Sequence, residues 1–496
     1  MELQKDYSCL ERSSIVMERT VEAENDYQEA LPAYCDDVYK IIKCAVRSSI
    51  SSVEVNGSDV TVNVKLHICM TYLNDNACLC YADFEENLSK SVNAENLSDR
   101  AFAYATVQEK YVNYRVINQR RIDIHCAILL NIRLFDIIKC PCLVSCENAR
   151  LKTETVETGL AVNSAVSKIE FDEDFLIPTD SDPIKRLVSW CANVTETDVR
   201  LIKDKVLVKG IVNLSVLYTT DGAQEQLQKA EYALNISKII DVRGVEEGDA
   251  VLNNMTVSNV YLKAKQSSGD ALRVISVFGE VCANLLFIRL TDESIITDGY
   301  ILNRRSQNTF SDYHCLTGGK LIKDTIAENV SFDLPDEMTE IKEIYLVPSQ
   351  PLLRGNKLSY KVTANIIGMT EDGDIVAVNS AVDMSYDATQ YENAFAVFSL
   401  QSFDYRFDSG SSVEVRMNIS ASVFAYQPSN FKILSDLEPT DDTVDYPSLT
   451  VYFAKKKEAL WDIAKQFSSD ALRIAADNDL SGDVIDTDRI IIIPKV

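Results

Sequence analysis

The sequence is poor in the residues and runs that mark several classes of protein. Only 16 of its 496 residues are glycine and 11 are proline, which argues against fibrous or low-complexity structure. No run of about 18 apolar residues occurs, so we expect no membrane-spanning helix. The first ten residues, MELQKDYSCL, contain no basic segment followed by an apolar one, so we expect no secretory signal.

Basic residues are also few. The chain has 49 lysines and arginines against 75 aspartates and glutamates, which gives a formal charge of −26. A surface this acidic repels phosphate backbones, so nucleic acid is not expected as a partner. The excess of acid suits a basic protein partner, or it serves solubility alone.

Groups that carry catalysis are scarce. There are three histidines, and neither a G-x-x-x-x-G-K-[ST] loop nor a G-x-S-x-G motif is present. Acidic residues are abundant, but no feature of the sequence places two of them together as a glycosidase pair. We therefore expect no enzymatic activity and no cofactor.

Cysteine is the exception, with thirteen residues, ten of them between Cys9 and Cys146. Without a visible signal peptide we expect reduced thiols. His67 and His125, beside Cys69 and Cys126, would form a His/Cys metal site only if their strands paired. Since C-x₂-C spacing is missing, buried thiols are the favoured interpretation and no metal site is expected.

One segment occurs three times. The copies read SSVEVNGSDVTVNVKLHICMTYLN, TDVRLIKDKVLVKGIVNLSVLYTT and QPLLRGNKLSYKVTANIIGMTED, with Val60, Val206 and Leu358 equivalent. Each copy alternates apolar and polar residues, which is typical of β-strands. A Leu-Pro or Ile-Pro pair precedes each copy, and its proline lies 28 residues before the equivalent position in the first two copies and 23 in the third.

Alternating strands also follow each copy, so we predict a mainly β protein built from three tandem β-rich domains. The predicted divisions are a lead at 1–14, a cysteine-rich first unit at 15–160, a second unit at 161–310, a third at 320–430, an acidic linker at 431–446 and a small module at 447–496. The linker is predicted because SDLEPTDDTVDYP carries five acids, two prolines and no base.

The last fifty residues predict a βααβ module. EALWDIAKQF places Leu460, Ile463, Ala464 and Phe467 at helical spacing. SDALRIAADND predicts a second helix that is capped by Ser469 or Asp470 and turns Leu472, Ala475 and Ala476 to one face. DRIIIIPKV predicts a short buried strand.

This module resembles the LysM family. The residues that match are Leu460 to Ala464, Asn478, and Ile490 to Pro494, in the same order and spacing. The resemblance implies binding of N-acetylglucosamine glycans such as peptidoglycan, in a groove between two loops. The predicted partner- or glycan-binding residues in these loops are Lys455, Lys456, Lys457, Glu458, Asn478, Asp479 and Leu480.

The module departs from the LysM pattern at three positions. Lys457 and Asp488 stand where the family usually has glycine, and Ala459 stands where it has threonine or serine. A lysine in place of glycine predicts a different loop shape. The basic triplet 455–457 has three interpretations: a solvated loop, a docking patch for an acidic protein, or part of a glycan site. Trp461 is expected in the core rather than as a sugar platform.

The repeated units resemble the SPOCS family of spore-coat-associated domains. DKVLVKGIVNLSVLYTTDG at 204–222 carries the resemblance best, and the other two copies are more diverged. SPOCS repeats followed by a LysM module imply a coat morphogenetic protein in the mother-cell cytoplasm at the forespore surface. They also imply a partner, a coat morphogenetic ATPase of the SpoIVA type. A non-catalytic scaffold is thus our main hypothesis, and a peptidoglycan-binding protein is the alternative.

Overall fold

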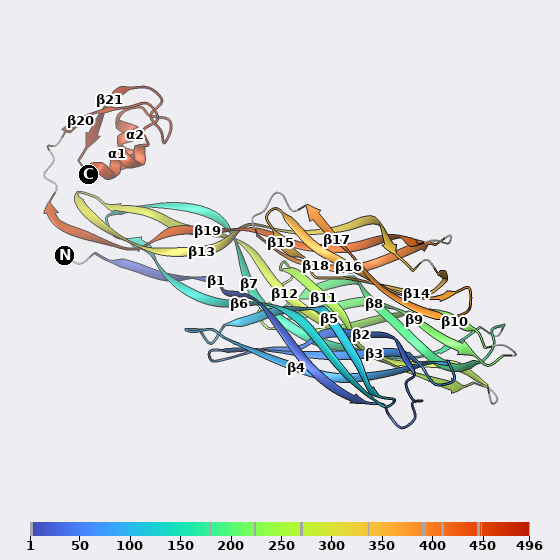
Figure 1. Cartoon of the computed structure of the whole chain (residues 1–496). Coiled ribbons are helices and arrows are strands. Elements are labelled where there is room, and N and C mark those ends of the chain that lie inside the picture. Colours follow the sequence, from blue (N-terminus) through green and yellow to red (C-terminus); the bar gives the residue numbers. More distant parts are fainter. Residues whose placement is uncertain are drawn as a thin grey trace.

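The structure is a computed structural model in which antiparallel sheets predominate and two short helices lie near the C-terminus (Figure 1). It describes residues 3–178, 180–222, 225–267, 271–335, 337–387, 393–407, 411–443, 447 and 449–495. The predicted fold class, mainly β with a small βααβ end, is confirmed.

One strand order occurs three times along the chain. Each set begins with a long lead strand, continues with a meander whose central strand pairs on both sides, and ends with a closing hairpin. The last strand of the hairpin pairs with the lead strand. The first set contains β1 (Lys5–Ala30), β2 (Lys40–Asn56), β3 (Asp59–Leu73), β4 (Leu79–Asn93), β5 (Phe102–Asn118) and β6 (Arg121–Cys146). Its sheets have the orders β1-β6-β5 and β2-β3-β4.

The other two sets repeat this order. The second set contains β7 (Ala149–Leu176), β8 (Ile184–Ile202), β9 (Lys205–Thr220), β10 (Leu227–Asp241), β11 (Ala250–Gln266) and β12 (Leu272–Ile301). The third set contains β13 (Arg304–Asp333), β14 (Met338–Pro348), β15 (Leu352–Arg354), β16 (Lys357–Thr370), β17 (Ile375–Asp387), β18 (Asn393–Arg406) and β19 (Ser412–Thr443). The sheets β7-β12-β11 and β13-β19-β18 join into one of six strands.

The aligned landmarks of the sequence occupy equivalent places in the three sets. Val60, Val206 and Leu358 are each the second residue of a central meander strand, and each is at most 1% exposed. Each of these strands follows a tight turn whose left-handed position is Gly57, Asp204 or Gly355. The alternation in the sequence therefore identifies the inward face of each meander.

The Leu-Pro and Ile-Pro pairs end the lead strands. Leu31, Ile177 and Leu334 are buried, and the backbone N–H of each donates to a carbonyl beside the turn of the closing hairpin, where its last strand begins. The carbonyl of the following proline then accepts from the residue three positions later, at 2.9–3.2 Å. Since proline has no N–H for a ladder, the strand stops there and the chain turns into the meander.

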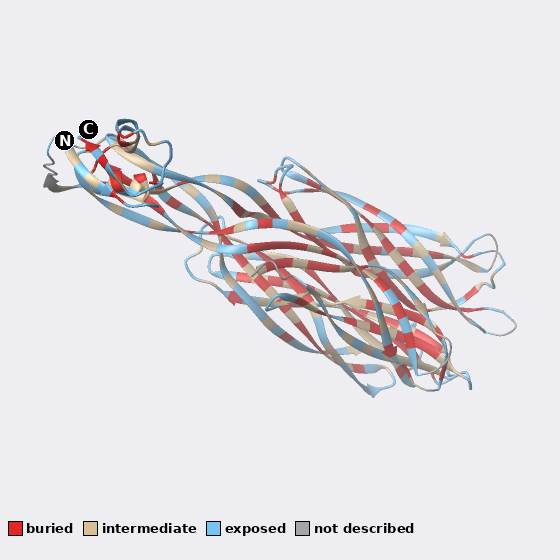
Figure 2. Cartoon of the chain, turned by 90° about the horizontal axis from the view of Figure 1, so that it is seen from above, coloured by how far each residue is buried: buried red, intermediate tan, exposed pale blue. Residues whose placement is uncertain are grey.

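Each meander packs against its own lead and closing strands, so each set has its own core. A further core joins the sets, with Phe135, Leu286, Phe395 and Phe424 among its members. Figure 2 shows buried and exposed residues alternating along these strands. We call this part of the molecule the body.

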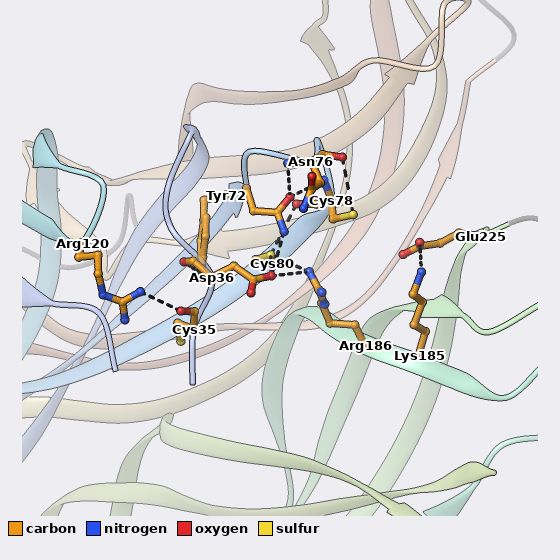
Figure 3. A network of polar contacts seen from close by, with 11 residues as sticks. Cys35, Asp36, Tyr72, Asn76, Cys78, Cys80, Arg120, Lys185, Arg186 and Glu225 are labelled. Atoms are coloured by element: carbon orange, nitrogen blue, oxygen red, sulfur yellow. Dashed lines mark hydrogen bonds and ion pairs between the residues drawn. The ribbon is translucent and has the colours of Figure 1, made fainter. Parts of the chain in front are cut away.

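A polar network links the first two sets at one end of the body (Figure 3). The guanidinium of Arg186 in β8 lies 2.8 Å from the Cys80 sulfur and 3.2 Å from the Asp36 carboxylate. Asn74 also donates to Asp36, at 2.8 Å. The hydrogen bond from Asn74 is the largest cause of a lowered pKa at Asp36, whereas burial raises the pKa of Cys80 to about 11.

Beyond the body, the ends of the long strands form three two-stranded ribbons that we call the stalk (Figure 1). Residues 5–15 pair with 135–146, 149–160 with 289–301, and 304–317 with 427–443. Side chains from different ribbons share two small cores, which include Cys142, Ile295, Tyr313 and Leu434. The stalk leads to the C-terminal module.

The stalk corrects the predicted divisions. The expected boundaries near 15, 160, 320 and 430 fall inside β1, β7, β13 and β19, which run from the stalk into the body without a break. Most of the predicted linker is also strand: residues 431–443 belong to β19 and pair with β13, with Leu434 and Leu437 fully buried. Ile433 of the same segment is also fully buried, so this acidic ribbon has apolar residues in both small cores of the stalk. Residues 444–446 lie outside the described part.

Candidate docking site in the C-terminal module

The C-terminal module has the predicted βααβ order. β20 (Leu449–Ala454) pairs antiparallel with β21 (Arg489–Pro494), and α1 (Leu460–Gln466) and α2 (Ala471–Asp477) cover one face of this sheet. Asp470 is the cap of α2, since its side chain accepts from the N–H of Leu472.

The predicted core is right for the first helix and only partly right for the second, where Ala475 packs against the core. Leu460, Ile463 and Ala464 are buried as expected. In α2, however, Leu472 is 79% exposed and Ile474 is the buried residue. The helix has only seven residues, so its spacing alone defined the inward face poorly.

The basic triplet lies on the loop after β20. Lys455, Lys456 and Lys457 are exposed, and their ammonium groups form no ion pair with the part of the chain that the structure describes. Glu458 stabilises the loop with two hydrogen bonds. Its carboxylate accepts from the Tyr452 hydroxyl at 2.6 Å and from the Lys455 N–H at 2.9 Å. The three lysine side chains are thus exposed on a turn whose shape is fixed by hydrogen bonds.

Lys457 has a backbone conformation that glycine adopts more readily than other residues. Its φ is +73°, in the left-handed region that a side chain disfavours. Its N–H donates to the carbonyl of Ile485 at 2.8 Å, and Ile485 donates back to Glu458 at 2.9 Å. These bonds hold the turn in shape.

The second predicted loop serves the fold more than a ligand. Asn478 is 9% exposed, and its amide donates to the carbonyls of Ile474 and Ile492 and accepts from the Ile492 N–H. Leu480 is partly buried against the core, whereas Asp479 is exposed. Asn478 therefore ties α2 to β21, and the free groups of the predicted site are mainly the lysines.

Sequence reasoning missed an apolar face beside the lysines. The outward side chains of the sheet are Leu449, Val451, Phe453, Ile490 and Ile492, which are 38–64% exposed in the complete chain. We call these five residues the apolar strip. The expected burial of the whole C-terminal strand is thus corrected, because only Ile491 and Ile493 face the core. A run of four isoleucines in a strand with period two was the signal for an outward apolar face.

The opposite side of the module contacts the stalk. Asp298, near the end of β12, accepts from the Trp461 indole N–H at 2.9 Å and from the Lys465 ammonium at 2.6 and 2.8 Å. The Trp461 ring packs edge-on against Tyr300, and Arg150 pairs with Asp470. Trp461 is therefore a contact between module and stalk. Burial raises the pKa of Asp298, but the bonds from Lys465 and Trp461 outweigh it, so the pKa lies below its usual value.

The histidine and cysteine pairs do not assemble into one site. His67 lies in β3 against Asp83 and Trp190, whereas His125 lies in β6 against Asp26. Eleven of the thirteen cysteines, all except Cys140 and Cys315, are free thiols, and no metal-binding cluster of His, Cys, Asp and Glu occurs among the described residues.

The fold and the geometry define a long antiparallel β protein with a small, partly uncovered terminal module. Residues 183–265 match the family model described as SipL, SPOCS domain. The chain thus carries a SPOCS domain over β8, β9, β10 and most of β11. No curated protein and no solved structure matches. In the described ranges, no helix is long and apolar enough to cross a bilayer.

Proposed function

We propose that this chain is a non-catalytic scaffold of spore coat assembly. It would act in the mother-cell cytoplasm at the forespore surface, where a coat morphogenetic ATPase of the SpoIVA type recruits it by protein contacts. The matched SPOCS domain supports the coat setting. The shared strand order of the three sets supports counting the first and third sets as SPOCS domains too.

The observation that carries the docking role is the apolar strip. It leaves large side chains open to solvent, next to three lysines that pair with no acidic residue of the described chain. Exposed apolar patches with a polar rim mark protein interaction sites, and charges at the rim guide the approach of a partner. The helix side of the module already contacts the stalk, so the strip is the face that remains for a partner.

The body would then serve as a spacer and as a second set of contacts. Three similar sets on one rigid chain raise the local concentration of binding surfaces, which suits the growth of a layer. The excess of acid over base, 75 against 49, would limit contacts between copies through repulsion.

The test measures binding of the full chain to the purified ATPase by surface plasmon resonance. Paired Phe453→Ser and Ile490→Ser changes remove the cross-strand pair at the lysine end of the strip, and we expect at least about 30-fold weaker binding. Replacing Lys455, Lys456 and Lys457 by glutamate reverses three charges. This change should slow association with the ATPase and reduce the salt dependence of the association rate.

The matched control is Leu472→Ser, an even more exposed apolar residue on α2, and this variant should bind as the unchanged chain does. Unchanged affinity in both the strip and the lysine variants would contradict docking through this face.

A second candidate function is favoured by one observation. The left-handed φ of Lys457 preserves the glycine-like turn of a LysM loop, so a groove for N-acetylglucosamine glycans is compatible with the backbone. Co-sedimentation of the same proteins with purified peptidoglycan separates the two. Binding to peptidoglycan without binding to the ATPase would replace the scaffold by a wall-binding protein.

A further inference from the structure

The two edges of the module's sheet differ in what covers them. At the outer edge of β21, the Asn478 side chain accepts from the Ile492 N–H at 2.6 Å and donates to the Ile492 carbonyl at 2.7 Å. The Ser469 hydroxyl donates to the Pro494 carbonyl at 2.6 Å. Among the described strands β20 pairs with β21 alone, so one edge of the sheet is closed by side chains and the other is open.

The bonds to Asn478 also determine where the backbone groups of β20 point. Val451 lies directly opposite Ile492, and these two residues do not bond to each other, since Ile492 turns its N–H and carbonyl toward Asn478. Backbone direction alternates along a strand, so the N–H and carbonyl groups of Leu449, Val451 and Phe453 point away from β21. Within the described ranges none of these groups has a hydrogen-bond partner. They form a row of free donors and acceptors along the open edge.

The sequence of β20 does not protect this edge. The strand reads LTVYFA, without a charged residue or a proline, whereas the edge strands β4 and β10 of the body carry Lys90, Lys229 and Lys238. Lysines on an edge strand are a common means of preventing its pairing with another chain. The three residues with free backbone groups are also 58–61% exposed and belong to the apolar strip. The open edge and the strip therefore form one continuous surface.

We propose that an extended segment of the docking partner adds to β20 as a third, antiparallel strand, an inference that rests on the docking function proposed above. Hydrogen bonds to the free backbone groups would supply affinity, and apolar residues at alternate positions of the segment would extend the strip. β20 runs toward Lys455, Lys456 and Lys457, so acidic residues at the N-terminal end of the segment would lie beside these lysines. The partner strand is thus defined as alternating and apolar, with an acidic start.

A peptide of that design tests the edge without the ATPase. The probe is fluorescein-labelled EDEVTVTV, titrated with the full chain and followed by fluorescence anisotropy at low salt. In the proposed pairing its valines lie opposite Leu449, Val451 and Phe453 and point their N–H groups at β20, whereas its threonine N–H groups point away. N-methylation of two valines should weaken binding at least about tenfold, because two hydrogen bonds are lost.

N-methylation of both threonines is the matched control and should leave binding of the peptide unchanged. The peptide KKKVTVTV should bind at least about tenfold more weakly than EDEVTVTV, because it places like charges beside the lysines. Equal effects of the two N-methylations, or equal binding of the acidic and basic peptides, would overturn the proposed pairing.

A change in the chain tests the same edge from the other side. Val451→Pro removes one outward N–H and no bond to β21, so it should weaken binding of EDEVTVTV at least about tenfold. Val451→Thr keeps both the N–H and the β-branched shape, and should weaken binding by less than about threefold. Binding of the peptide by Val451→Pro as tightly as by the unchanged chain would overturn the proposal.

Competition with the ATPase separates this inference from the scaffold function. We expect EDEVTVTV to displace the ATPase from the full chain in surface plasmon resonance. Binding of the ATPase without binding of the peptide would overturn the third strand and leave the scaffold standing. Binding of the peptide without the ATPase would keep the strand-binding edge and remove the ATPase as its partner. A dimer of the full chain that Val451→Pro dissociates would assign the edge to a second copy and overturn the proposal.

Discussion

The body and the C-terminal module differ in what they place on the outer face of a sheet. In β3 of the body, the inward residues Val60, Val62 and Val64 alternate with the outward residues Thr61 and Asn63. In β20 of the module, the outward positions carry Leu449, Val451 and Phe453 instead, and all three remain exposed.

The outward face of β3 is suited to water, whereas we expect a partner to cover the outward face of β20. An antiparallel sheet with one solvated side normally shows apolar residues inward and polar residues outward. The first part of β3 in the body follows that rule, so this face needs no partner. The module breaks the rule on five neighbouring side chains, which is why we place docking there.

The body and the module also differ in the contacts that stabilise them. The largest effect that we expect is a loss of stability of the body. Arg47 of β2 lies over the Trp190 ring at 3.9 Å, donates to the Trp190 carbonyl at 3.2 Å and points at the Cys69 sulfur at 3.8 Å. It also faces Tyr345, so one guanidinium joins all three sets. Arg47→Ala should lower the free energy of unfolding by about 3 kcal/mol, because it leaves these partners unpaired. Urea unfolding followed by tryptophan fluorescence measures this.

The sulfur beside Arg47 explains part of that cost. Burial raises the pKa of Cys69, but the charges of His67 and Arg47 outweigh it and lower the pKa. Arg115→Ala is the control: that side chain is 76% exposed and should change stability by less than about 0.5 kcal/mol. Equal unfolding midpoints for the two variants would show that Arg47 does not join the sets.

The strands of the body could be predicted from the sequence, but the continuation of the long strands into the stalk could not. Val60, Val206 and Leu358 stand out because burial on one face imposes a period of two, which a sequence displays directly. The stalk was missed because a two-stranded ribbon buries little, so Leu434 and Leu437 were outweighed by the acids around them.

The candidate site shows the same limit. The lysine triplet was visible in the sequence, whereas the contact between Trp461 and Asp298 joins residues 163 positions apart and has no local signal. The apolar strip is present in the sequence, but a run of four isoleucines does not show whether one face of the sheet is covered or both. A period of two determines which residues share a face, and only the packing shows which face is covered.

A smaller effect should separate the module from the stalk. Asp298→Ala removes the acceptor of Trp461 and Lys465 and should destabilise the contact by about 2 kcal/mol. Hydrogen exchange should then speed up in α1 while the body's central strands stay protected. Glu154→Ala, an exposed acid on the same stalk, is the control. Unchanged exchange in α1 would mean that the module is held by other contacts.

Acid should produce the same separation in the unchanged chain. The folded pKa of Asp298 is lowered from its ordinary 3.8, so its contribution is complete above that value. The contribution is lost as the pH falls through the folded pKa, when Asp298 takes up a proton and its pairing with Lys465 ends. Asp298→Ala should remove this part of the acid sensitivity of α1.

The smallest effect that we expect is a change in the stability of the module's lysine loop. Lys457 holds φ at +73°, a conformation that costs a residue with a side chain about 1 kcal/mol relative to glycine. Lys457→Gly should therefore stabilise the module by about 0.5 kcal/mol, after the greater freedom of glycine in the unfolded chain is counted. Hydrogen exchange at the N–H groups of Lys457 and Leu460, which bond to Ile485 and Asp483, reports this stability.

Lys456→Gly is the matched control, because it removes the same charge at a neighbouring position without a left-handed φ. It should destabilise the loop slightly, while both variants should weaken binding to the ATPase by a similar small factor through the lost charge. Stability and affinity would then move in opposite directions for Lys457→Gly alone. That result would mean that the strained lysine is kept for its charge at the rim of the apolar strip. A loss of stability in Lys457→Gly would instead show that the lysine side chain supports the turn, and the rim charge would lose its separate role.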